Sequence, residues 1–230
     1  MCRMMAITGF DLSRHKGIVD NFFRLAVKGK VPPKNAPGHL DGWGIGWHKN
    51  GKAKILKSGN SIVKEKARFY AALRLIGKAD ILMLHLRKAA WDKTARQKHA
   101  HPFVFKGRIF SHNGTIFDYK KLLPKIPKEH RPESGALDTE VYFRYLIKGF
   151  PEDFNKSIKF IKGSNEYSSL SFLLSDGRKL YAYRQYSKWP DYYTLYKATE
   201  NGSAIISSEP LDSALSWKLI KPGKLYGVPA

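Results

Sequence analysis

Cys2 is the only cysteine in the 230-residue chain, and it stands directly behind the initiator methionine. If Met1 is removed, the chain begins with a residue whose thiol and free α-amino group belong to the same amino acid. The thiolate is a nucleophile, and the adjacent amine can accept its proton, directly or through a water. The ordinary pKa values, about 8.5 for the thiol and about 7.7–8.0 for the amine, are close enough for easy proton exchange near neutral pH. The alternative is a small hydrophobic residue at the start of a first strand.

Seven short motifs follow one another along the chain. They are Cys-Arg-Met at 2–4, the glycine-rich segment 39–47, His85-Leu86-Arg87, His101-Pro102-Phe103, residues 112–116, Asp138-Thr139-Glu140, and residues 208–212 with Trp217 beyond them. Together they resemble the class II glutamine amidotransferases, the N-terminal nucleophile hydrolases whose processed first residue is cysteine. The last motif is similar to small stand-alone amidohydrolase-type members. The resemblance predicts a single domain of this family over residues 2–230, in which Cys2 is the nucleophile.

The resemblance also implies how the reaction is stabilised. Acyl transfer from a γ-amide passes through a tetrahedral intermediate whose oxyanion needs fixed hydrogen-bond donors, and losing one donor typically costs about 2.7–4 kcal/mol of barrier. The family uses an asparagine side chain and the backbone N–H of the next glycine, which match Asn113 and Gly114. The alternative for an Asn-Gly pair is a type I′ hairpin turn.

Three further residues match the substrate pocket of the family. Arg87 corresponds to the arginine that binds the substrate α-carboxylate, a task suited to a bidentate guanidinium. Asp138 corresponds to the carboxylate that receives the substrate ammonium, and we assign His101 a supporting place near the pocket. The alternatives are a surface salt bridge for Arg87 and a helix N-cap for Asp138.

The sequence also departs from the glutamine-using synthases. There the arginine is followed by a Trp-Ala-Thr-like run, whereas Arg87 is followed by Lys88-Ala89-Ala90 and lacks that hydroxyl. The donor can therefore be glutamine or a γ-glutamyl compound. In the segment Asp41-Gly42-Trp43-Gly44 we expect the glycines to bring backbone close to the nucleophile, with Trp43 as a packing residue. A phosphate-binding loop is disfavoured because the glycine spacing is wrong and no Walker lysine is present.

The sequence implies no cofactor and no metal. Eight histidines and one cysteine form no convincing ligand set. His99 and His101 are expected on one strand face, without the two further ligands that a zinc site needs.

The elements that position these residues follow from periodicity and turn signals. Expected helices cover 14–29, 61–77, 138–148 and 152–162, and 124–135 is expected to be a loop. The expected strands are 4–8, 43–47, 53–57, 81–86, 108–111, 168–174, 179–183, 193–196 and 204–207. This pattern favours an α+β fold, in which two antiparallel sheets are flanked by helices in a four-layer αββα sandwich. Cys2 would then lie at the end of a central strand, facing a cleft formed by 85–91, 112–116 and 137–140.

Composition limits the class of protein. Lys and Arg number 41 against 19 Asp and Glu, a net charge of +22. Because the basic residues are spread along the chain, nonspecific contact with polyanions is expected rather than dedicated nucleic-acid recognition. The single cysteine excludes an internal disulfide, and no apolar run suits a signal peptide or a membrane span. We expect a cytoplasmic protein that makes no membrane contact.

These observations predict an enzyme that hydrolyses a side-chain γ-amide through a Cys2 thioester and releases ammonia or another amine. The expected small-molecule substrate is glutamine or a γ-glutamyl compound, and the ammonia is either passed to a partner synthase subunit or simply released. Two alternatives remain open. One is a catalytically inactive basic protein of the same fold that binds nucleic acid or another polyanion, and the other is a hydrolase of non-glutamyl amides.

Overall fold

Two antiparallel sheets form the centre of the computed structural model, which describes residues 2–91 and 93–230. The larger sheet has the strand order β11-β9-β10-β1-β4-β2-β3, so β1 lies in its middle. Its strands are β1 (Arg3–Asp11), β2 (Trp43–Lys49), β3 (Lys52–Ser58), β4 (Lys78–Leu86), β9 (Tyr196–Glu200), β10 (Ser203–Ser207) and β11 (Lys218–Leu219). The smaller sheet has the order β12-β8-β7-β6-β5, with β5 (Phe103–Phe105), β6 (Arg108–Asn113), β7 (Ser171–Ser175), β8 (Lys179–Tyr183) and β12 (Leu225–Pro229).

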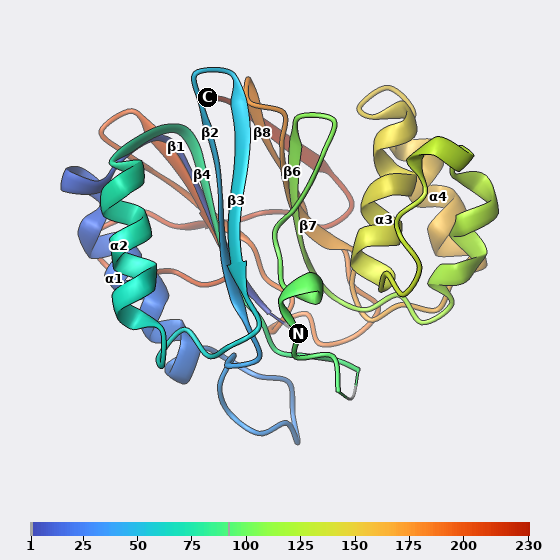
Figure 1. Cartoon of the computed structure of the whole chain (residues 1–230), viewed down its shortest axis with the longest axis horizontal. Coiled ribbons are helices and arrows are strands. Elements are labelled where there is room, and N and C mark those ends of the chain that lie inside the picture. The colour runs from blue at the N-terminus through green and yellow to red at the C-terminus, as the bar shows by residue number, and fades with distance from the viewer. Residues whose placement is uncertain (1, 92) are drawn as a thin grey trace.

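Helices cover the outer face of each sheet. Helices α1 (Leu12–Lys28) and α2 (Lys66–Ile76) lie on the larger sheet, and α3 (Asp138–Leu146) and α4 (Phe154–Ser164) lie on the smaller one (Figure 1). The resulting order of layers is helix, sheet, sheet, helix, which confirms the expected αββα sandwich. Four short 3-10 turns complete the described elements, at Gln97–His99, Tyr119–Lys125, Lys128–His130 and Ile147–Gly149. None of the described helices is both long and apolar enough to span a membrane.

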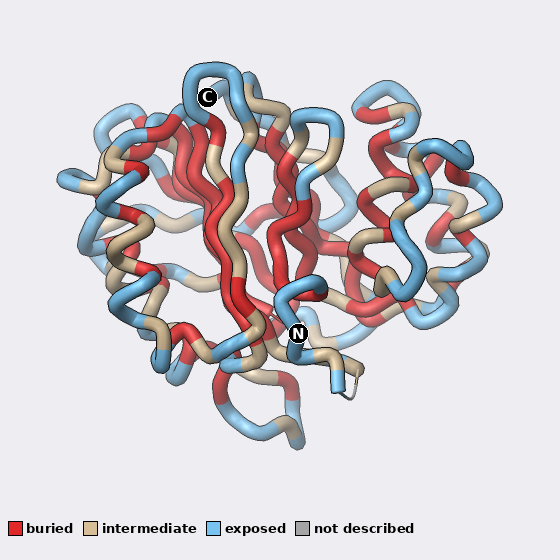
Figure 2. Tube along the Cα trace, in the orientation of Figure 1, coloured by how far each residue is buried: buried red, intermediate tan, exposed pale blue. Residues whose placement is uncertain are grey.

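Strand β1 packs against both neighbouring layers because its side chains alternate between the two faces of the sheet. Met5 and Ile7 belong to the apolar cluster beneath α1 and α2, whereas Met4 and Ala6 belong to the cluster between the sheets. A third cluster fills the space between the smaller sheet and α3 and α4. Figure 2 shows the outcome, with buried strands through the middle and exposed loops around them. The strand that follows Cys2 is therefore packed on both of its faces.

Helix α1 has clear end signals. The Asp11 side chain accepts a hydrogen bond from the Ser13 N–H at 2.9 Å, which satisfies a free donor of the first turn. At the other end the N–H of Gly29 reaches the carbonyl of Leu25. The buried residues of the helix recur at helical spacing and form one face: His15, Ile18, Val19, Phe22 and Ala26.

Glycines of β2 let the two sheets approach each other. A Cβ on Gly44 would lie 2.1 Å from the carbonyl oxygen of His101, and one on Gly46 would lie 2.7 Å from Ile109. The expectation that Gly44 brings backbone close to the nucleophile was therefore wrong, because the backbone it approaches is that of His101. Trp43 is fully buried against Phe69, as expected for a packing residue.

Several element boundaries differ from the predictions. Helix α2 begins at Lys66 rather than at 61, because residues 62–65 form turns. The buried segment 193–195 is not a strand, and β9 starts at Tyr196. The proline-rich region predicted as a loop contains 3-10 turns. Strands β5, β11 and β12 were not predicted, since they are short or lie at sheet edges.

Candidate active site

Cys2 is the residue directly before β1, at one end of the central strand of the larger sheet. It is buried, with 5% of its surface exposed. Its backbone nitrogen donates a hydrogen bond to Asn113 Oδ1 at 2.8 Å, and its Sγ lies 3.8 Å from the Lys88 carbonyl oxygen. The sulfur therefore lies between the ends of β4 and β6, one from each sheet.

The next residue fixes this strand end. Arg3 is fully buried, and its guanidinium donates to the carbonyl oxygens of Cys2 and Lys30. Its Nε forms an ion pair with Glu209 at 2.6 Å. Ser208 adds a second anchor, because its Oγ accepts from the Met4 N–H and its own N–H donates to the Met4 carbonyl. The motif at 208–212 thus holds the segment that presents Cys2.

Asn113 ends β6 and faces Cys2 from the other sheet. Its Oδ1 accepts from the Cys2 nitrogen, but its Nδ2 is buried and has no hydrogen-bond partner within the described residues. A buried amide N–H₂ without a partner is energetically costly unless a ligand supplies the acceptor. Asn113 and Gly114 do not form the alternative hairpin turn, because Asn113 pairs with Ser171 of β7.

His112, the residue before Asn113, is neutral and fixed in one tautomer. Its Nε2 lies 2.9 Å from the Ser169 carbonyl, which can only accept, so Nε2 has the proton. Its Nδ1 then accepts from the Thr139 hydroxyl at 3.1 Å. Burial lowers the pKa of His112 to about 3. These two bonds tie β6 to Thr139 of α3 and to Ser169, which lies just before β7.

Arg87 extends from the end of β4 and is only 4% exposed, so it is no surface salt bridge. Its Nη1 and Nη2 donate to the carbonyl and hydroxyl of Thr94 at 2.8 and 3.0 Å. Its backbone pairs with Asp41 and Gly42 of the glycine-rich segment. Position 90 is an alanine, and the hydroxyl that contacts the guanidinium is that of Thr94.

Asp138 is the first residue of α3 and not its N-cap, a position that Leu137 occupies. Its Oδ2 accepts from the Ile116 N–H at 3.0 Å, and its Oδ1 lies 3.4 Å from the Trp91 indole nitrogen. Burial raises the pKa of Asp138 to about 6, although these donors lower it. The carboxylate thus bonds two groups outside its own helix, the Ile116 N–H and the Trp91 indole, in addition to the backbone of Thr139.

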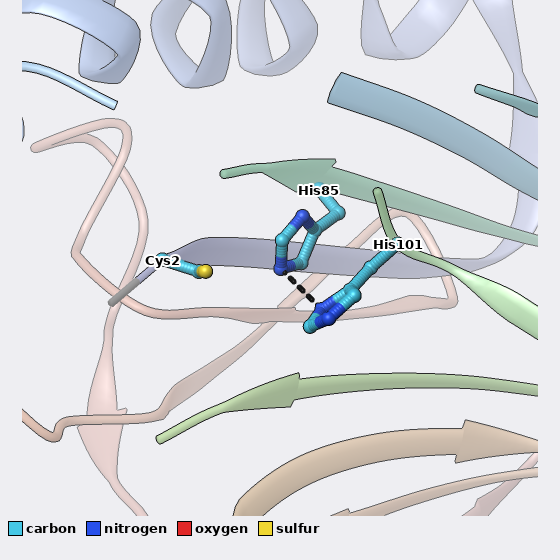
Figure 3. A group of neighbouring side chains, drawn as sticks. All are labelled: Cys2, His85 and His101. Atoms are coloured by element: carbon cyan, nitrogen blue, oxygen red, sulfur yellow. Dashed lines mark hydrogen bonds between the residues drawn. The ribbon is translucent and has the colours of Figure 1, made fainter. Parts of the chain in front are cut away.

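His85 and His101 lie beside the sulfur of Cys2. His85 is on β4, His101 follows the turn at Gln97–His99, and their Nε2 and Nδ1 atoms are 2.8 Å apart (Figure 3). The expected strand face with His99 was wrong, since His99 belongs to that 3-10 turn. In Figure 3 the Cys2 side chain points towards the His85 ring.

The environment of Cys2 favours its thiolate. Burial raises the pKa of the thiol, but the positive charges of the chain N-terminus and His85, with a hydrogen bond from His85, lower it to about 5. Thiolate is the reactive form of cysteine, so the sulfur is prepared for attack at neutral pH.

Five of the six predicted residues line one cavity of about 30 Å³, and the sixth, Asn113, contacts Cys2. The five are Cys2, Arg87, His101, Gly114 and Asp138. This volume holds about one water. A larger molecule must therefore move side chains that line the cavity, and these include Trp91, which also bonds Asp138.

Sequence reasoning assigned no role to His85, Trp91 or Thr94. His85 was within a motif, but nothing in its spacing showed that it meets His101. Trp91 and Thr94 follow Arg87 by four and seven residues, and only the path of their loop brings them to Asp138 and Arg87.

Two comparisons match the sequence of the chain to known proteins. The family model "Glutamine amidotransferases class-II" matches residues 1–196. An uncharacterized protein of Methanocaldococcus jannaschii is 29% identical over 161 residues, which are 64% of this chain and 43% of that protein.

Solved structures show the same fold. A glutamine phosphoribosylpyrophosphate amidotransferase of B. subtilis, complexed with ADP and GMP, aligns with a TM-score of 0.70 at 14% identity, over 99% of this chain and 47% of that one. A glutamine aminotransferase class-II domain protein from Silicibacter pomeroyi aligns with a TM-score of 0.68 at 20% identity, over 100% and 95%. The chain thus spans less than half the length of the M. jannaschii relative and of the B. subtilis chain.

Proposed function

Because the chain belongs to the class II glutamine amidotransferases, we propose that it hydrolyses the γ-amide of glutamine or of a γ-glutamyl compound through a thioester on Cys2. The observation that most supports this is Asn113, whose Oδ1 holds the Cys2 nitrogen while its buried Nδ2 has no partner among the described residues. An oxyanion formed next to Cys2 would supply the missing acceptor.

The reaction requires removal of Met1, which frees the Cys2 α-amine. The Sγ attacks the amide carbon, and the amine takes the thiol proton and passes it to the leaving nitrogen. Asn113 Nδ2 and the Gly114 N–H stabilise the oxyanion of each tetrahedral intermediate. Ammonia or an amine leaves, and a water then cleaves the thioester to release the γ-carboxylate and restore the thiol.

Two charged groups would select the substrate. Arg87 would bind the α-carboxylate, and Asp138 would receive the α-ammonium; both line the cavity with Cys2. Entry would move the Trp91 indole away from Asp138 and replace its hydrogen bond with that of the substrate. His101 would support the wall of the pocket, where its ring also packs against Phe103.

The nitrogen that leaves the amide has two possible fates. We propose that the ammonia is passed to a partner synthase or is released as a product of simple hydrolysis. The synthase would have to dock near the cavity that Cys2 lines, because free ammonia is lost to solvent.

Mass spectrometry of the intact protein tests the proposal. After incubation with diazo-oxo-norleucine, a glutamine-like electrophile, the purified protein should lack one methionine residue and have one label on Cys2. Cys2→Ala should remain unlabelled and inactive, and a matched surface variant, Lys52→Ala on the edge strand β3, should be labelled like the wild type. Active protein that retains Met1 would contradict the mechanism.

A panel of amides separates the proposed substrates from non-glutamyl amides. Glutamine, γ-glutamyl dipeptides and simple amides without an α-carboxylate are compared in wild type and in Arg87→Ala. The proposal expects loss of kcat/KM in Arg87→Ala only for substrates that have the α-carboxylate. Wild-type turnover of simple amides that is as fast as that of glutamine and the γ-glutamyl dipeptides would favour the non-glutamyl alternative.

A further inference from the structure

Three side chains with metal-binding atoms meet beside the nucleophile. The Cys2 sulfur and one nitrogen each of His85 and His101 lie within 4.8 Å of one another, and all three residues are buried (Figure 3). They come from distant parts of the chain: the residue before β1, the strand β4, and the loop after the Gln97–His99 turn. The proposed hydrolysis uses only the first of them as a reacting group.

We propose that these three residues form a reversible binding site for a thiophilic divalent cation, zinc above all, which switches the nucleophile off. One thiolate and two imidazoles are the ligands that zinc and similar borderline ions prefer, whereas magnesium and calcium prefer oxygen. The site goes beyond the proposed hydrolysis, because metal binding needs neither substrate nor turnover.

The present distances are close to those of a tetrahedral site. With Zn–S near 2.3 Å and Zn–N near 2.0–2.1 Å, neighbouring ligand atoms lie roughly 3.3–3.6 Å apart. The two histidine nitrogens, now 2.8 Å apart, would have to separate by about half an ångström. The remaining donor pairs, at 4.8 Å or less, would close by at most about 1.5 Å. Side-chain rotations of that size need no change in the sheets.

The contact between the two imidazoles supports a cation at this place. His85 Nε2 and His101 Nδ1 face each other at 2.8 Å, the distance of a hydrogen bond between the two rings. A bound cation replaces the proton of that hydrogen bond, which moves to the other nitrogen of its ring or leaves, and a proton on the thiol is lost to solvent. The bonds formed are one metal–sulfur and two metal–nitrogen bonds, with no change of oxidation state.

A fourth ligand can come from the cavity. Cys2 and His101 both line it, and its volume of about 30 Å³ admits a water. A tetrahedral ion with three protein ligands and one water is then complete. In this state the sulfur is bonded to the metal and cannot attack an amide.

Two features of the site limit its affinity, as a reversible switch requires. His85 Nδ1 is buried without a hydrogen-bond partner among the described residues, so the outer contact that usually strengthens a ligating histidine is missing. The Arg87 guanidinium also lines the cavity and repels a cation. Binding should therefore be reversed by a chelator without unfolding the protein.

Cobalt serves as the spectroscopic probe. Metal-free, Met1-processed protein is titrated with Co²⁺ alone, and the expected result is one ion per chain with a thiolate-to-cobalt charge-transfer band and tetrahedral visible bands. Zn²⁺ should displace the cobalt, and Mg²⁺ should not. A titration without a thiolate band overturns the proposal, whatever the variants show.

Variants then locate the ligands. His85→Gln and His101→Gln keep hydrogen-bonding groups but remove a nitrogen ligand, and each should weaken Co²⁺ binding by at least about 10-fold. Cys2→Ser should abolish the charge-transfer band. His130→Gln, on a partly exposed histidine in the turn Lys128–His130, is the matched control and should bind like the wild type. Unchanged affinity in both His85→Gln and His101→Gln, with native circular dichroism, would refute the site.

A protection experiment separates this inference from the proposed hydrolysis. One equivalent of Zn²⁺ should slow alkylation of Cys2 by iodoacetamide at least about 10-fold, and a chelator should restore the rate. If the protein fails to hydrolyse any amide yet shows this protection, the proposed function fails and the metal site stands. If it hydrolyses glutamine and Zn²⁺ gives no protection, the metal site fails and the proposed function stands.

Discussion

Asn113 has two polar atoms with different tasks. Its oxygen accepts a hydrogen bond from the Cys2 nitrogen. Its own nitrogen has no hydrogen-bond partner among the described residues, and we propose that it donates to the oxyanion. Because the two tasks belong to different atoms, substitutions can separate them. An aspartate keeps an acceptor for Cys2 and loses the donor, whereas an alanine loses both.

We expect Asn113→Ala to lower kcat by about 10²–10³-fold, the usual effect of removing one oxyanion donor. Asn113→Asp should lose at least as much, because its negative charge repels the oxyanion while the Cys2 contact is kept. Steady-state kinetics measures both variants, and alkylation of Cys2 by iodoacetamide controls for an intact nucleophile. A kcat of Asn113→Asp within about threefold of the wild type would exclude Asn113 as a donor.

Asp138 is a carboxyl group whose pKa lies near the working pH. Burial raises that pKa to about 6, so the group is ionised above pH 6 and neutral below it. Only the ionised form attracts an ammonium. The selectivity for an α-ammonium should therefore depend on pH in a range where the substrate amine itself stays charged.

The expected measurement is the ratio of kcat/KM for glutamine to that for its α-deamino analogue. Because Cys2 attacks both substrates, the effect of its ionisation on kcat/KM cancels in the ratio. It should fall as pH drops from 7 through about 6 to 5, in line with the Asp138 pKa. In Asp138→Asn the ratio should be low and independent of pH. A ratio that stays constant in the wild type would remove Asp138 from ammonium recognition.

At the scale of elements, the sequence predicted the layers well and the site in part. The first strand, expected at 4–8, and the first helix, expected at 14–29, depend on local sequence signals, and both are present as β1 and α1. The family motifs identified Cys2, Asn113 and Arg87 as parts of one site. The cavity confirms Cys2 and Arg87 as neighbours of one another, while their catalytic and binding roles stay proposals.

Contacts between distant loops were not predictable. His85 and His101 are 16 residues apart, and their meeting depends on the turn at Gln97–His99 and on the glycines of β2. Residues 193–195 were predicted as part of a strand, but they lie outside every strand, and the Tyr193 hydroxyl bonds Ser168. The periodicity of apolar residues in a sequence predicts which side chains are buried, but it does not predict which residues they contact.

Gly44, on β2, affects the position of His101 in the site although it does not line the cavity. Its missing Cβ leaves room for the carbonyl of His101, which is 2.1 Å from where that Cβ would be. We expect Gly44→Ala to lower the free energy of unfolding by about 1–3 kcal/mol or more, through overpacking. The same substitution should displace His101.

The matched control for Gly44→Ala is Gly17→Ala, on the exposed face of α1, where an added Cβ meets nothing within 4 Å. It should raise the free energy of unfolding by about 0.5–1 kcal/mol, because alanine loses less entropy in a helix. Urea unfolding at equal m-value measures both. An unchanged free energy of unfolding in Gly44→Ala would show that the two sheets can separate at this point without a loss of stability.

At the scale of the whole molecule, the charge is unusual. Lys and Arg exceed Asp and Glu by 41 to 19, which gives +22. Lysines at exposed positions of the edge strand β3, such as Lys52 and Lys54, contribute to it. Such a field attracts phosphate polymers without selecting a sequence.

We therefore expect single-stranded RNA of any sequence to bind at low salt. Log Kobs should fall linearly with log salt, by about 0.7 for each phosphate contacted. Cys2→Ala should bind RNA as the wild type does and hydrolyse no glutamine. If the wild type hydrolyses no glutamine and binds RNA tightly and with sequence selectivity, the inactive polyanion-binding alternative is favoured. Fluorescence anisotropy at several salt concentrations measures the slope.

The buried nitrogen of Cys2, bonded to Asn113, has a practical consequence for whoever produces the protein. Any peptide left on that nitrogen turns the amine into an amide, which can no longer act as the base of the proposed reaction. An uncleaved affinity tag at the N-terminus should thus give protein that is folded but catalytically inactive. A tag after Ala230, which is exposed, leaves the front free for the cell's own methionine aminopeptidase.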